Sequence, residues 1–89
     1  MSSNRMTDEE VAAIFDRDDE IGYIGDSLVA LFKKKGAIVS PHEALGVVAE
    51  EYHELIDAIR DNDRDETLRE LWDLGVGALA AFYSLQPKD

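Results

Sequence analysis

The sequence contains no cysteine, only two prolines and fewer than half as many basic as acidic residues. Without cysteine, the chain offers no disulfide, no thiolate metal site and no thiol nucleophile. Nine lysines and arginines against 20 aspartates and glutamates give a net charge of −11. This charge disfavours binding to a phosphate backbone, so we expect no contact with polymeric nucleic acid. It admits an anionic ligand only where a cation screens the site.

Long apolar runs are also missing from the chain. No stretch is long enough to span a bilayer, and the N-terminal residues lack the apolar core of a signal peptide. We therefore expect a cytoplasmic protein without membrane contact. The 89 residues, 45% of them apolar, suffice for one small domain whose core is marginal in a monomer. We predict a flexible tail over residues 1–6 and a single helical domain over residues 7–86.

Capping signals and apolar spacing together predict an all-α fold. Thr7 and Glu10 form a capping box that opens a short helix, and the acids of residues 16–20 interrupt it. Three longer helices are predicted over residues 21–35, 41–60 and 65–85. Gly36 and the acidic turn at residues 61–65 separate them. The expected architecture is a short N-terminal helix plus three longer helices, packed as an antiparallel bundle that oligomerisation completes.

Four acids in the last two predicted helices are placed unusually. Glu51 and Glu54 stand three residues apart, as do Glu70 and Asp73, so each pair shares a helix face. On a helical wheel, Glu51 and Glu54 border the apolar arc instead of the side that meets water. We therefore predict that the four carboxylates converge in the helix bundle and hold a divalent cation.

Asp73 is the strongest of these signals. It is the only charged residue from Leu71 to Leu85, and a helix that is apolar all round is expected to be buried. A lone buried carboxylate costs roughly several kcal/mol unless it is paired, hydrogen-bonded or bound to a metal. The alternative to a metal is neutralisation by Arg64, Arg69 or a lysine.

Other metal sites fit the sequence less well. The acid-rich segments at residues 16–27 and 61–72 mimic calcium loops, but Ile21 and Glu66 occupy the position that requires glycine. Glu50 and His53 form one Glu-x-x-His, whereas ferritin-like di-iron bundles need two such motifs. A site made only of carboxylates suits Mg²⁺, or Mn²⁺, better than zinc or copper.

Residues for binding a substrate are less well defined. The three lysines at residues 33–35 suit the C-terminal end of a helix, and Lys33 and Lys34 are also candidates for a cationic rim that meets triphosphate. Trp72 and Tyr83 are candidates for stacking on a base, although core packing explains them as well. The apolar final helix exceeds what one short chain can cover, which predicts a homodimer or homotetramer.

The acids and their surroundings resemble the MazG-like, all-α nucleoside triphosphate pyrophosphohydrolases. The motif is Glu50-Glu51-x-x-Glu54, fifteen intervening residues, then Glu70-x-x-Asp73, and the resemblance covers roughly residues 21–85. It implies Mg²⁺-dependent hydrolysis of (deoxy)nucleoside triphosphates to monophosphate and pyrophosphate. It also implies Glu51, Glu54, Glu70 and Asp73 as metal ligands and a catalytic role for Glu50, which orients a ligand or the attacking water.

Two other classes of function remain open from the sequence. One is a catalytically inactive module that binds metal through the same acids. The other is a helical interaction or regulatory module whose acids are surface and capping groups.

Overall fold

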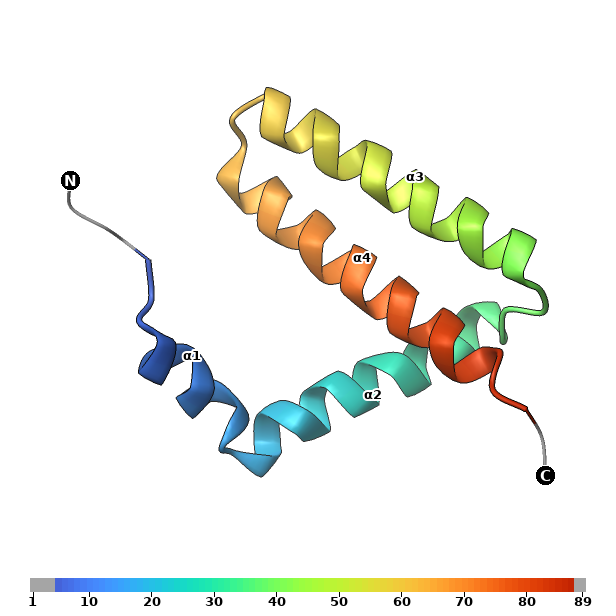
Figure 1. The fold of residues 1–89 in the computed structure, drawn as a ribbon, viewed down its shortest axis with the longest axis horizontal. Coiled ribbons are helices and arrows are strands. Elements are labelled where there is room, and N and C mark those ends of the chain that lie inside the picture. The colour runs from blue at the N-terminus through green and yellow to red at the C-terminus, as the bar shows by residue number, and fades with distance from the viewer. Residues whose placement is uncertain (1–4, 88–89) are drawn as a thin grey trace.

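The computed structural model describes residues 5–87 and consists of helices joined by short connections (Figure 1). The four helices are α1 (Asp8–Phe15), α2 (Asp18–Lys35), α3 (Pro41–Arg60) and α4 (Arg64–Ser84). No strand is present within this described range, so the predicted all-α class with one short and three longer helices is confirmed. Most of the predicted flexible tail, residues 1–4, lies outside the described residues.

Side-chain caps fix where three of the helices begin. The hydroxyl of Thr7 accepts a hydrogen bond from the Glu10 amide at 3.1 Å, and the Glu10 carboxylate accepts one from the Thr7 amide at 2.9 Å. Ser40 caps α3 by accepting from the Glu43 amide at 3.1 Å, and Asp63 caps α4. These caps satisfy amides that have no partner within the helix. These three starts are therefore set locally. Helix α4 begins one residue before the predicted start at residue 65, and α2, which has no side-chain cap, begins three residues before the predicted start at residue 21.

Helices α3 and α4 form an antiparallel hairpin that holds most of the core (Figure 1). Small residues make up most of the buried positions of these two helices, namely Ala58, Gly77, Ala80 and Ala81, beside Leu55 and Glu70. A side chain at Gly77 would meet a methyl group of Val47 at 3.6 Å. Small residues bring two helix backbones close together, so polar groups at the edge of this surface also come close.

The other two helices leave the hairpin instead of completing a bundle with it. Among the described residues, helix α2 packs on α4 but not on α3, and α1 packs only on α2 (Figure 1). The rings of Tyr23 and Trp72 stack between α2 and α4, with centroids 5.4 Å apart. The connection from α2 to α3 is held to the end of α4, where the Ile38 amide donates to the Ser84 hydroxyl at 3.1 Å. Within one chain the predicted antiparallel bundle is thus formed by α3 and α4 alone.

Helix α4 is only partly buried within the single chain, as expected of a helix whose apolar surface exceeds what one short chain can cover. Phe82 and Tyr83 are each 56% exposed, and Leu71 is 48% exposed. One face of α4 is buried against α3 and α2, while the opposite face has no neighbour among the described residues. None of the described helices combines the length and the hydropathy that crossing a bilayer requires.

Candidate functional site

Three carboxylates meet at the middle of the α3–α4 hairpin. Glu51 comes from α3, and Glu70 and Asp73 come from successive turns of α4. One oxygen from each of the three lies within 4.8 Å of the others. Because α3 and α4 run antiparallel at close distance, a pair of acids one turn apart on α4 faces a single acid on α3. The arrangement brings together three of the four predicted ligands.

Two oxygens of this cluster are buried without a partner. Glu70 is only 6% exposed, and its Oε2 atom has no hydrogen-bond donor among the described residues. The Oε2 atom of the half-buried Glu51 is likewise buried and has no hydrogen-bond donor among the described residues. A buried carboxylate oxygen that no group neutralises is unfavourable, so it requires a proton or a cation.

The acid–base properties of the cluster follow from this crowding. Burial raises the pKa of Glu51, and the negative charges of Glu54 and Asp73 raise it further. The pKa of Glu70 is raised to about 8, first by burial and then by hydrogen bonds that its protonated form shares with Glu54 and Glu66. The charges of Glu54 and Glu51 add to this effect. Near neutral pH the metal-free cluster therefore retains a proton at Glu70.

The sequence predicts the wrong acid as the buried one. Glu70 is buried, whereas Asp73 stays accessible to solvent. The reason is the rotation of α4, whose buried line runs through Glu70, Gly77 and Ala80. Neutralisation of Asp73 by a base is not observed either, because Arg69 pairs with Glu66 at 2.7 Å and no described base forms an ion pair with Asp73.

The rotation of α3 also differs from the prediction. Glu51 was expected at the edge of the apolar arc, but it lies between Val47 and Leu55 on the face that meets α4. Ile59, an apolar residue on another side of α3, is 55% exposed. Because α3 has only α4 as a neighbour, its contact face is narrower than its apolar arc and is centred nearer to the acids.

The remaining acids of the motif lie at the border of the cluster. Glu54 is exposed and interacts with Glu70, but it is not among the three residues whose oxygens converge. Glu50 is exposed and acts on the cluster through its charge, which raises the pKa of Glu51. His53 is also exposed, next to Tyr52, and does not join the cluster.

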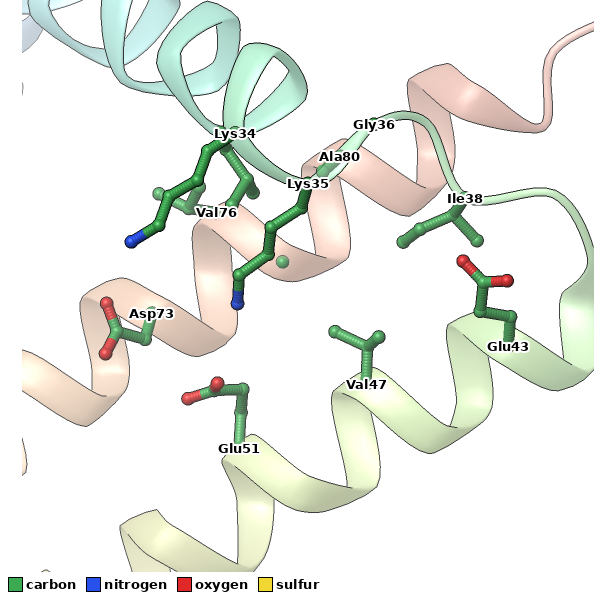
Figure 2. A pocket seen from close by; sticks show the side chains of 12 residues that line it. Lys34, Lys35, Gly36, Ile38, Glu43, Val47, Glu51, Asp73, Val76 and Ala80 are labelled. Atoms are coloured by element: carbon green, nitrogen blue, oxygen red, sulfur yellow. The ribbon is translucent and has the colours of Figure 1, made fainter.

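A pocket of about 350 Å³ opens beside Glu51 and Asp73. Its floor is apolar and is formed by residues of α3 and α4 such as Val47, Val76 and Ala80. Lys34 and Lys35 reach into it from the end of α2, on the side facing the carboxylates (Figure 2). None of the ion pairs in the described range joins these lysines to the acids. The pocket therefore has one acidic wall, one basic wall and open space between them.

Not all of the predicted substrate-binding residues line the pocket. Lys34 lines it, whereas Lys33 and Trp72 do not, and one face of the Trp72 ring is used by the stack with Tyr23. Two charged lining residues, Lys35 and Glu43, were not among the predicted site residues. The available signal for Glu43 is its spacing of eight residues from Glu51 by way of Val47, which places all three on neighbouring turns.

The donor set of the cluster is consistent with a hard cation. All three converging groups are carboxylates, and Mg²⁺ and Mn²⁺ prefer oxygen ligands. The two unpartnered buried oxygens provide the independent reason to expect a cation there. The open pocket leaves room for waters or for ligand oxygens, which Mg²⁺ usually keeps in its coordination shell.

We expect Glu70 to make the metal-free protein less stable as pH rises from about 4.5 to about 8. Its folded-state pKa of about 8 exceeds the ordinary value of 4.5, so the folded state binds more protons across this window. The stabilising contribution is complete below the ordinary pKa and is lost as pH passes through the raised pKa. Urea unfolding near both ends of the window should show that Glu70→Gln, whose amide does not ionise, loses less stability than the native protein.

The matched control for this experiment is Asp57→Asn, an exposed acid on α3. It should keep the pH dependence of the native protein. An identical dependence in the native protein and Glu70→Gln would contradict the proposed environment of Glu70.

Comparison with known proteins identifies no relative. No protein-family model, curated protein or solved structure matches the chain. The site is therefore argued from its own geometry, and the family resemblance rests on the spacing and the neighbours of the acids alone.

Proposed function

We propose that the protein is a Mg²⁺-dependent hydrolase that converts (deoxy)nucleoside triphosphates to monophosphate and pyrophosphate. The observation that carries this proposal is the convergence of Glu51, Glu70 and Asp73 around two buried oxygens that lack a partner. The spacing of these acids, which resembles that of MazG-like pyrophosphohydrolases, supports the reaction type. The proposed setting is the cytoplasm, in a homodimer or homotetramer.

In this proposal Glu51, Glu70 and Asp73 hold the cation, and Glu54 completes the ligand set from the border of the cluster. Bound Mg²⁺ supplies charge neutralisation and polarisation of phosphoryl oxygens. Mn²⁺ can bind the same carboxylate oxygens. Glu70 must lose its proton when the cation binds, because a carboxylic acid is a poor ligand. Binding of the cation should therefore release protons near neutral pH.

Lys34 and Lys35 are proposed to grip the triphosphate. Their ammonium groups lie across the pocket from Glu51 and Asp73 (Figure 2). A triphosphate placed between the two walls would have a cation on one side and lysines on the other, which offsets its repulsion by the acidic chain. Glu50, exposed and adjacent to Glu51, is proposed to orient the attacking water.

The second candidate function is a catalytically inactive module that binds metal or another helical protein. The extensive exposed apolar surface of α4 supports it. Metal binding without turnover would indicate the metal-binding module. Absence of metal binding at millimolar Mg²⁺ would indicate the interaction module.

We expect Glu70→Gln and Asp73→Asn to reduce pyrophosphate release by more than ~100-fold, because loss of a direct ligand costs more than loss of a supporting contact. Release is measured with Mg²⁺ across a panel of canonical and modified nucleoside triphosphates. Asp57→Asn is the control and should retain activity. Full activity in either ligand variant would show that the cluster is not the active site.

Lys35→Ala and Lys34→Ala are expected to raise KM for the best substrate of that panel by roughly 10-fold or more, the effect of losing one hydrogen bond to a charged group. Lys33→Ala is the matched control, since Lys33 lies on the same turn of α2 but does not line the pocket. The steady-state rate law of each variant gives KM and kcat separately. Equal effects from all three substitutions would indicate general charge attraction instead of contact at the pocket.

A further inference from the structure

A second apolar face runs along the outside of α4. It consists of residues at helical spacing on the side opposite the buried line of Glu70, Gly77 and Ala80. We refer to it as the outer stripe, formed by Leu68, Leu71, Gly75, Leu79 and Phe82. The four large side chains are 56, 48, 40 and 56% exposed, in that order. No charged residue belongs to the stripe, although the chain as a whole carries a net charge of −11.

Gly75, at the centre of the outer stripe, is not explained by packing within the chain. A side chain added there would meet nothing within 4 Å, whereas one at Gly77 would meet Val47. A glycine inside a helix costs roughly 1 kcal/mol relative to alanine. At Gly77 the added side chain would be in ordinary van der Waals contact with α3, whereas Gly75, like Gly22, Gly25 and Gly46, has no neighbour within 4 Å in the chain. Glycine at an exposed helix position is explained where another backbone approaches closely.

The outer stripe is symmetric about Gly75. Leu71 and Leu79 lie four residues on either side of it, and Leu68 and Phe82 lie seven residues on either side. If a second α4 crosses antiparallel at Gly75, each Leu71 faces the Leu79 of the other copy, and each Leu68 faces a Phe82. A surface with this property is self-complementary about a two-fold axis, as an isologous dimer requires.

We propose that the outer stripe binds the outer stripe of a second copy, antiparallel, with the two α4 helices crossing at Gly75. The proposal identifies the face through which the homo-oligomer proposed above assembles. It rests on the oligomer in the proposed function and not on the enzymatic activity. The antiparallel order also places opposite ends of the two helix dipoles together, which is favourable.

The area of the outer stripe favours a second copy as the occupant, and the lack of charged residues in the stripe permits one. Two acidic chains repel each other, and the outer stripe is a surface on which they can meet without bringing acids together. The four large side chains and the flanking Trp72 and Tyr83 offer on the order of 600 Å² per copy, close to the ~800 Å² per partner of a specific interface.

The absence of cysteine allows the crossing point to be tested by single-cysteine variants. Gly75→Cys should form a disulfide-linked dimer on mild oxidation, because the crossing brings two copies of this position within the ~7 Å that a disulfide spans. Val39→Cys is the control, since Val39 is 79% exposed in the connection between α2 and α3 and is not part of the stripe. A mixture of Leu71→Cys and Leu79→Cys should cross-link between the two variants more than within either.

Light scattering on the native protein should give twice the chain mass of 9.9 kDa or a multiple of it. Leu79→Lys should dissociate the assembly while keeping its helical circular dichroism, and Ile59→Lys, at a more exposed apolar site on α3, should not dissociate it. A monomeric native protein, an assembly that survives Leu79→Lys, or equal cross-linking at residues 39 and 75 would each overturn the proposal. These measurements need neither metal nor nucleotide, so they test the dimer proposal independently of the enzymatic proposal.

Discussion

The close packing of α3 on α4 is the constraint on which the other properties of the protein depend. Ala58, Gly77 and Ala80 let the two helices approach, and the same approach forces Glu51, Glu70 and Asp73 together. Close packing of the two helices forms the core, but it also brings the three carboxylates near enough to repel one another. That repulsion is relieved either by a proton on Glu70 or by a cation among the three carboxylates. A binding site is thus a direct consequence of how the hairpin is held together.

The remaining helices provide the groups that the hairpin lacks. Helix α2 ends beside the cluster and places Lys34 and Lys35 across a pocket from the acids (Figure 2). The bond from the Ile38 amide to the Ser84 hydroxyl holds the following connection to α4, so the basic wall has a fixed relation to the acidic wall. Acids and bases on opposite walls suit a ligand that is itself anionic and arrives with a cation. A triphosphate has this chemistry.

The sequence predicts well what is decided locally. Helix starts at Thr7, Ser40 and Asp63 depend on side chains that cap neighbouring amides, and these are readable from adjacent residues. The grouping of the acids in pairs also follows from helical periodicity. By contrast, the burial of Glu70 in place of Asp73 depends on how far each helix is rotated about its axis when it meets its neighbour.

That rotation could not be predicted because both α3 and α4 have apolar residues over more of their circumference than one chain covers. The helical wheel gives the centre of all apolar residues, whereas the residues that are buried are Leu55 and Ala58 on α3 and Glu70, Gly77, Ala80 and Ala81 on α4. The same limit explains why Lys33 and Lys35 could not be distinguished, since consecutive lysines at a helix end differ only in direction. Small residues do not by themselves identify the contact face, since Gly77 lies within it and Gly75 lies on the opposite, exposed face of α4.

The most direct test of this account is to locate Mn²⁺ in crystals by its anomalous scattering. The account predicts a peak between Glu51, Glu70 and Asp73, coordinated by the two buried oxygens that lack a partner in the metal-free protein. Crystals soaked at millimolar Mn²⁺ that show no peak there, or a peak only at the exposed acids of other helices, would contradict it.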